Sequence, residues 1–237
     1  MTSRAKQIPW MRVLVEGMVI VVSILLALAL DAWWDGVKEG EAGREYLVAL
    51  RGELEVVRAE LRTDQEARTR RFETMGALLS NIASQRPASP DSVTTLLGSL
   101  WGSVRLNPPS AVYDDLQATG SLVTSGAIRG ELLQYRQRLS RLMWQEERLQ
   151  DTWETELRPY LVAQTDVLRH IPRTYGVSDD WLPIPIHGSG YETILRDRTF
   201  QNLLLVRLRR LSLAMVNGDT LLEGVDRLLA LIEHEVG

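Results

Sequence analysis

A run of eighteen residues near the N-terminus, Val13 to Leu30, constrains this chain more than any other feature. It reads VLVEGMVIVVSILLALAL and carries one charged side chain, Glu16, and one hydroxyl, Ser23. A helix of roughly 20 apolar residues, rising ~1.5 Å per residue, crosses the ~30 Å hydrocarbon core of a bilayer. We therefore expect a transmembrane helix over residues 13–34. The alternative is a buried helix of a soluble protein.

Tryptophans and charges flank this run as they flank a membrane span. Trp10 and Arg12 precede the run, and Trp33 and Trp34 follow it, so these four are the predicted membrane-interface residues. Basic residues come before the run and acidic residues after it, which predicts a cytoplasmic tail over residues 1–12 and an extracytoplasmic C-terminal part. In a Gram-negative bacterium, this is an inner-membrane protein with a periplasmic domain. A cleaved signal peptide is disfavoured because Glu16 interrupts the apolar core.

Glu16 is the one ionisable residue of the apolar run 13–30, and ionisable residues within a span are candidates for function. Arg12 lies four residues earlier, so the two side chains can pair and reach the headgroups together. Alternatively, Glu16 binds a neighbouring transmembrane helix, whose close approach Gly17 would permit. A third alternative is a carboxylate that couples proton or ion movement to function.

Three long runs of apolar residues beyond Tyr46 recur in steps of three and four, the period of coiled coils. They predict an all-α fold: an N-terminal transmembrane helix, then an elongated antiparallel bundle of three long helices over residues 46–237, with short capping helices. The seam residues are Leu47, Leu50, Leu54, Val57, Leu61, Phe72, Met75, Leu79 and Ile82; then Ile128, Leu132, Tyr135, Leu139, Leu142, Leu149, Trp153 and Tyr160; then Leu204, Leu208, Leu211, Met215, Gly218, Leu222, Val225, Leu229, Ile232 and Val236.

Polar residues interrupt the seams at Gln65, Arg68, Glu146 and Glu156. If the first two long helices are antiparallel, Arg68 and Glu146 fall at similar heights and form a buried layer that fixes register. The alternative, which is commoner, is that both lie on solvated faces. The seam passes through Gly218 without a change of phase, which predicts a continuous helix with tight packing there.

The connections contain glycine and proline. Three glycines in residues 35–45 suggest a hinge or a poorly held helix. Residues 87–126 contain two helix-start signals and are expected to cap the end of the bundle away from the membrane. The proline-rich loop 171–190 would then return toward the membrane. Its apolar residues, which would face headgroups or a partner subunit, are Trp181, Leu182, Ile184 and Ile186; the alternative is that this loop closes the bundle end.

Two stretches are similar to a family of bacterial single-pass membrane proteins of unknown function. VEGMVIVVSILLALALDAWWD with REYLVALRGELEVV resembles that family's anchor, with Glu16, Asp31 and Trp34 at its acid and Asp–x–x–Trp positions. The segment from Asn107 to Leu139 resembles its helical centre. The matching residues there are Tyr113, Asp114, Asp115, Leu116, Gly120 and Leu122. The chain departs from the family at Val123–Gly126, where an apolar residue and Asn are usual. The resemblance implies topology but no activity.

Chemistry-bearing motifs are absent from the sequence. There is no phosphate loop, dinucleotide fingerprint, metalloprotease helix or nucleophile elbow, and there are no cysteines. The net charge of −4 argues against nucleic-acid binding, and no cofactor or small-molecule substrate is indicated. We therefore expect a non-enzymatic accessory or scaffolding subunit that contacts membrane lipid and other membrane-protein subunits. The alternatives are an extracytoplasmic ligand-binding sensor and an ion-coupled transducer that uses Glu16.

Overall fold

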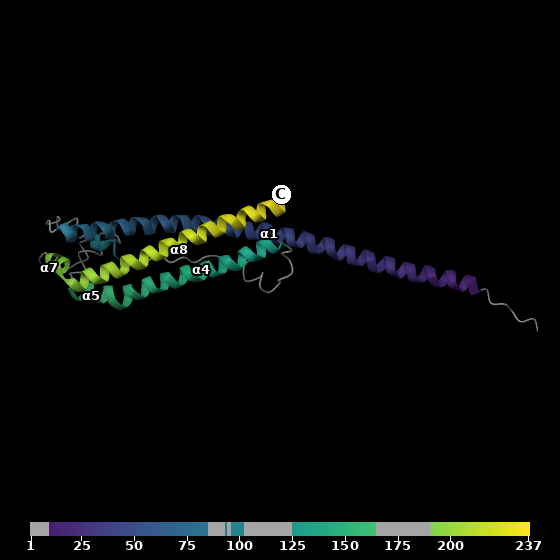
Figure 1. Cartoon of the computed structure of the whole chain (residues 1–237), viewed down its shortest axis with the longest axis horizontal. Helices are drawn as coiled ribbons and strands as arrows, with labels where there is room; N and C mark the ends of the chain where they lie inside the picture. Colours follow the sequence, from purple (N-terminus) through teal and green to yellow (C-terminus); the bar gives the residue numbers. More distant parts are fainter. Residues whose placement is uncertain (1–9, 85–92, 94–95, 102–124, 165–190) are drawn as a thin grey trace, which may run out of the picture.

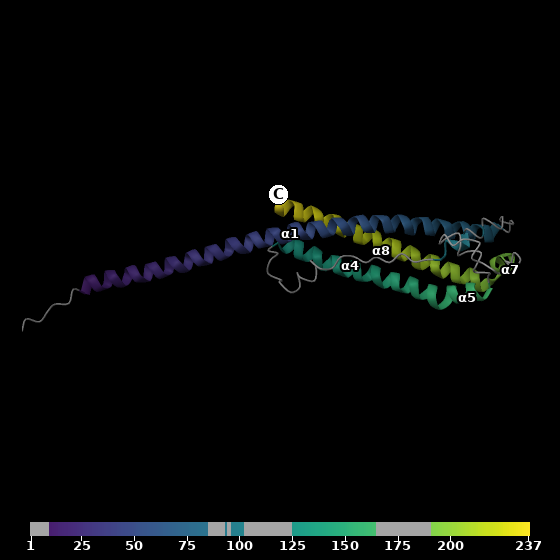
Figure 2. The same cartoon turned by 180° about the vertical axis from the view of Figure 1, so that it is seen from behind.

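The computed structural model describes residues 10–84, 93, 96–101, 125–164 and 191–237, and within them it confirms the all-α class. The elements are α1 (Trp10–Ser84), α4 (Gly126–Thr152), the π-helical turn η1 (Trp153–Leu157), α5 (Arg158–Gln164), α7 (Tyr191–Arg196) and α8 (Arg198–Val236). Helices α1, α4 and α8 form an elongated bundle, and the N-terminal part of α1 projects beyond it (Figure 1). The view from behind shows the same arrangement (Figure 2).

Helix α1 continues without a break from the apolar run into the bundle. Every residue from Met18 to Ala42 is exposed, and Gly43 is the first buried residue after them. The apolar part is long and apolar enough to cross a membrane, and no other described part of the chain buries it. Residues 35–45, where we expected a hinge or a poorly held helix, therefore form a continuous helix that is exposed up to Ala42. The alternative that the apolar run is the core helix of a soluble protein is not supported.

The second long helix runs in the direction opposite to the one that we expected. Helix α4 begins beside the part of α1 near Leu47 and ends beside the part near Leu78, so α1 and α4 are parallel. Only α8 is antiparallel to both, and its C-terminus lies where α1 leaves the bundle (Figure 1). The connection from Ser84 to Gly126 spans about 40 residues, enough to cross the length of the bundle, which is about 60 Å at ~1.5 Å per residue. Long crossovers of this kind permit parallel neighbours.

The parallel direction of α1 and α4 corrects two predictions about the connections between the helices. Val93, Leu97 and Leu100 pack in the far half of the bundle, as a cap would, but the 87–126 connection then finishes at the opposite end. Helices α5 and α7 both lie at the far end, so the connection between them starts and ends away from the apolar segment. The argument that placed the 171–190 loop beside a bilayer is therefore wrong. The loop itself lies outside the described residues.

Two apolar clusters fill the bundle, one in each half. The half near the apolar segment buries Leu47, Leu50, Leu54, Val57, Leu61, Ile128, Leu132, Tyr135, Leu142, Ala214, Leu221, Val225, Leu228, Leu229 and Ile232. The far half buries Met75, Leu78, Val93, Leu97, Leu100, Trp153, Leu157, Leu161, Ile194, Phe200, Leu204 and Leu211. Most are the seam residues expected from the three-four period, because that period keeps one stripe of each helix facing its neighbours.

A π turn shifts the seam of the second helix by one residue. Glu156, which the unbroken period places in the seam, is exposed, and Leu157 is buried instead. The backbone N–H of Arg158 bonds to the carbonyl oxygen of Trp153, five residues back. Pro159 follows and has no N–H to donate, and proline within a helix disturbs the regular hydrogen bonds in this way. The prediction for Glu156 was wrong because it assumed an undisturbed helix.

Candidate functional site

A buried ion pair joins α1 and α4 at the middle of the bundle. Arg68 is 2% exposed and Glu146 is 6% exposed, and Nη2 of Arg68 donates a hydrogen bond to Oε1 of Glu146. The Asp64 carboxylate lies 3.7 Å from the same guanidinium nitrogen. The predicted Arg68–Glu146 contact is confirmed and the solvated-face alternative is wrong. The contact forms between parallel helices, because both residues lie near the middle of the bundle, between its two apolar clusters.

Gln65 connects this ion pair to α8. Its Oε1 accepts a hydrogen bond from Arg68 Nη1 at 2.8 Å. Its Nε2 donates to the carbonyl oxygen of Met215 at 2.8 Å and to Oδ1 of Asp219 at 2.6 Å. Together these side chains form what we call the central polar layer: Asp64, Gln65, Arg68, Glu146 and Asp219. The layer ties all three long helices together at one height.

Gly218 makes room for the amide of Gln65. A Cβ atom at position 218 would lie 2.5 Å from Gln65 Oε1 and 2.7 Å from Cδ. The Gln65 amide cannot move aside without cost, because three hydrogen bonds hold it in place. This confirms that α8 is continuous through Gly218 and that the position is tightly packed.

The electrostatics of the layer indicate a structural role. Burial raises the pKa of Asp64, and the nearby charges of Arg68 and Arg71 only partly oppose this effect. A charge that is removed from water is tolerated only with a well-placed partner, and replacing one member alone leaves the other uncompensated. The layer separates the two apolar clusters, so a slip of one helix would place these charges against leucines. We conclude that it specifies register.

A second ion cluster lies nearer the apolar segment. Oε1 of Glu131 accepts hydrogen bonds from Arg138 Nη1 at 2.5 Å and from Arg227 Nε at 3.2 Å. Although burial would raise the pKa of Glu131, these hydrogen bonds lower it. The ionised carboxylate therefore stabilises the fold above the ordinary pKa of about 4.5, and this stabilisation is lost as pH falls through the lowered value. Gly224 of α8 accommodates Arg138, whose Nη1 would lie 2.4 Å from a Cβ there.

A second buried arginine, Arg207 of α8, lies in the far half without an ionic partner in the part of the chain that the structure describes. It is 6% exposed, and Nη2 donates to the Leu100 carbonyl at 3.3 Å while Nη1 has no hydrogen-bond partner there. The guanidinium lies over the ring of Trp153, 4.8 Å from its centroid. Sequence reasoning missed Arg207, because it flanks the seam between Leu204 and Leu208 like an ordinary surface arginine.

The predicted membrane-interface residues occupy the projecting part of α1. Trp33 and Trp34 are 63% and 54% exposed at the end of the apolar run, and Lys38 Nζ lies 5.8 Å from the Trp34 ring centroid. Trp10 and Arg12 lie in the first turn of α1, and the structure does not describe their side chains.

The other predicted site residues are not brought to the central polar layer. Glu16 and Gly17 lie in α1 within the apolar run, far along the helix from Arg68, and their side chains are not described. Trp181, Leu182, Ile184 and Ile186 lie outside the described residues. Among the described residues, no three His, Asp or Glu side chains cluster so that they could hold a metal ion.

Comparisons with protein-family models, with curated proteins and with solved structures find no match for this chain. The resemblance to a bacterial single-pass family is not tested by them and stays a prediction. Of its residues, Asp31 and Trp34 lie exposed on α1 and the side chain of Glu16 is not described. The Tyr113–Leu122 segment lies outside the described residues.

Gly218→Ala should lower the free energy of unfolding by about 1–2 kcal/mol, because the methyl group displaces Gln65 from its hydrogen bonds. Gly52→Ala is the matched control, since nothing lies within 4 Å of a Cβ there, and it should raise stability by up to ~1 kcal/mol. Urea unfolding of the detergent-solubilised chain measures both. In a Gln65→Ala background Gly218→Ala should no longer be destabilising; an undiminished loss there contradicts the assignment.

Arg68→Leu should destabilise the bundle by about 3–5 kcal/mol, because it leaves Glu146 buried without its partner. The double variant Arg68→Leu/Glu146→Leu should recover that loss and reach or exceed the stability of the parent by about 1–4 kcal/mol. Thermal unfolding followed by circular dichroism compares the three proteins. A small effect of the single change, or a double change as damaging as the single one, would show that the ion pair is not the buried contact described above.

Proposed function

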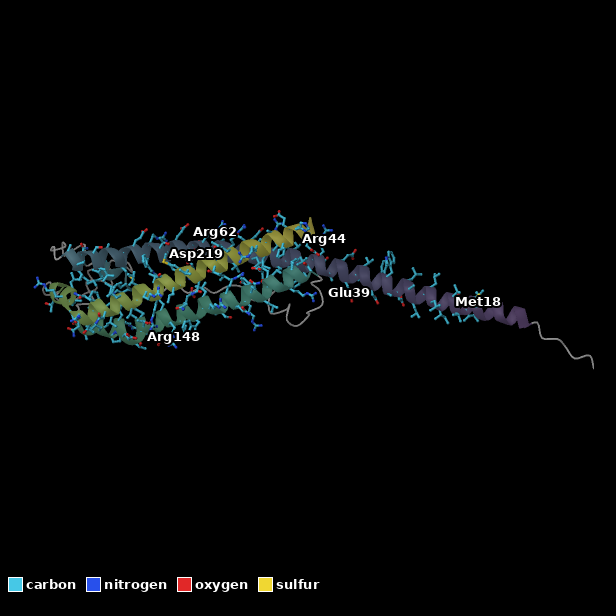
Figure 3. The ribbon with its side chains drawn as sticks, viewed as in Figure 1. Met18, Glu39, Arg44, Arg62, Arg148 and Asp219 are labelled. Carbon is cyan, nitrogen blue, oxygen red and sulfur yellow. The ribbon has the colours of Figure 1, made fainter. Side chains whose placement is uncertain are left out.

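We propose that this chain is a membrane-anchored, non-enzymatic scaffold: an accessory subunit of a larger membrane assembly, in a bacterial inner membrane, with a cytoplasmic N-terminus and an extracytoplasmic bundle. The supporting observation is the continuity of α1, which carries an exposed apolar segment and one wall of the bundle in a single helix of 75 residues. Side chains around Met18 stand clear of every other element in Figure 3.

A continuous helix holds the bundle at a fixed distance from the apolar segment, which a flexible tether does not do. Between Trp34 and Gly43 the exposed helix adds about 13 Å at ~1.5 Å per residue, and the bundle extends about 60 Å further. Polar layers that fix register suit such a rod, because they hold the three helices at set heights. These features support a role in holding partners at a defined distance from a bilayer.

The outer surface of the bundle retains apolar side chains that a scaffold would use. Trp144 and Met143 of α4 are 52% and 48% exposed, and Leu133 of the same helix is 62% exposed. Arg148 lies 5.5 Å from the centroid of the Trp144 ring and leaves the ring half exposed. Exposed tryptophan, methionine and arginine are enriched at protein interfaces.

Purification of the full-length chain from native membranes in a mild detergent tests the scaffold proposal. We expect native mass spectrometry to find it in complexes with other membrane proteins. Trp144→Ala should reduce recovery of partners, whereas Val162→Ala, an exposed apolar position of α5, should not. A chain that always runs as a lone monomer overturns the proposal.

The orientation can be tested without interfering thiols, because the chain contains no cysteine. A maleimide that does not cross membranes should label Ser140→Cys, at an exposed position of α4, in intact spheroplasts. It should label Ser3→Cys in the N-terminal tail only after the membrane is permeabilised. The reverse pattern contradicts the proposed topology while leaving the anchor itself in place.

A further inference from the structure

Arg207 is a buried cation without a compensating charge among the described residues. Its side chain is 6% exposed, and its hydrogen-bond acceptor is a neutral carbonyl, that of Leu100. Nη1 is buried and has no acceptor within the same part of the chain. Burial, with a further contribution from the charge of Arg71, lowers the pKa of Arg207 to about 10. An isolated buried charge is strongly unfavourable, so this arrangement requires a reason.

A cavity adjoins the two arginines. Arg71 of α1 and Arg207 of α8 both line it, together with Met75, Ser99, Leu100, Leu149 and Leu211. Its volume is about 10 Å³, close to the room that one water-sized particle needs. The lining thus combines two guanidinium groups with apolar walls, and none of its described residues is a carboxylate.

A second unsatisfied donor lies in the same region. The Trp101 indole Nε1 is buried without an acceptor in the described ranges, and this ring packs edge-on against Trp153 at 5.1 Å between centroids. The Arg207 guanidinium lies over the same Trp153 ring. Two buried N–H donors that lack acceptors in the described structure, Trp101 Nε1 and Arg207 Nη1, therefore flank one tryptophan. Native proteins leave few such donors unpaired, and an anion is able to accept their hydrogen bonds.

We propose that this cavity binds one monatomic anion of the size of chloride, held between Arg207 and Arg71. The anion accepts a hydrogen bond from Nη1 of Arg207, and the charges of both guanidinium groups attract it. The apolar walls and small volume exclude larger anions. The site joins α1, α8 and the Leu97–Leu100 segment, so occupancy stabilises the far half of the bundle. It is independent of the proposed scaffold role.

The test is thermal unfolding of the full-length protein in detergent, with sodium gluconate replaced stepwise by sodium chloride at constant ionic strength. Gluconate is too large for the cavity and serves as the reference anion. We expect the unfolding temperature to rise by about 3 °C for each tenfold increase of chloride above the dissociation constant. Phosphate, which is larger, should have a smaller effect at equal concentration.

Variants separate specific binding from general salt effects. Arg207→Met should abolish the response to chloride and, in gluconate, be at least as stable as the parent, because it removes a charge buried without a partner. Arg71→Met should weaken chloride binding about tenfold or more, since one of the two cations is lost. Arg209→Met, at an exposed position two residues away, should respond like the parent.

Bromide gives a direct readout, because its anomalous scattering would locate it beside Arg207 in crystals of the full-length protein. An absent chloride response in the parent overturns the proposal, as does an equal response in the parent and in Arg207→Met. If Arg207→Met does not fold, Arg71→Met decides: an unchanged affinity for chloride overturns the proposal, and a weakened affinity supports it.

Discussion

The Arg68–Glu146 ion pair is the interaction on which the arrangement of the three helices depends. Leucine seams attract one another at any register that differs by a heptad, so apolar burial alone does not choose a height. A buried guanidinium has one acceptable height, the one that places its carboxylate partner opposite. Gln65 extends this selection to α8, and Gly218 provides the space that its amide needs. Specificity in this bundle therefore comes from polar atoms, and cohesion comes from the leucines.

The same constraint explains why parallel packing of α1 and α4 is tolerated. Arg68 and Glu146 lie near the middle of the bundle, between its two apolar clusters, so their contact can form in either direction. The remaining contacts decide: Leu47 clusters with Ile128, and Met75 with Trp153, which only parallel helices allow. Helix α8 then closes the bundle as the antiparallel third member and finishes beside Arg44, which donates to the Val236 carbonyl.

The features that depend on residue spacing along a helix could be predicted from the sequence. The direction of the second long helix could not, because it depends on the route of the connection before it. The apolar run, the three seams, the continuity at Gly218 and the Arg68–Glu146 contact all follow from residue spacing. Helix direction does not, because a connection of about 40 residues permits either direction; its length was the available signal. Pro159 was the signal for the π turn that moves the seam from Glu156 to Leu157. Arg207 and Asp219 gave no signal, since both resemble solvated residues until the neighbouring helix is placed.

Arg68 and Arg207 are both buried in the bundle, but their guanidinium groups have opposite surroundings. Arg68 is surrounded by acceptors from two helices, and its charge is compensated within the protein. Arg207 meets a carbonyl and an aromatic face, each of which is a weaker partner than a carboxylate, and the like charge of Arg71 repels it. A buried charge that fixes helix register must be fully compensated in the correct alignment of the helices. Every other alignment then leaves that charge without its partner and is less stable. An under-compensated cation beside a cavity has no such value for register, and an anion that enters the cavity would lower its free energy further.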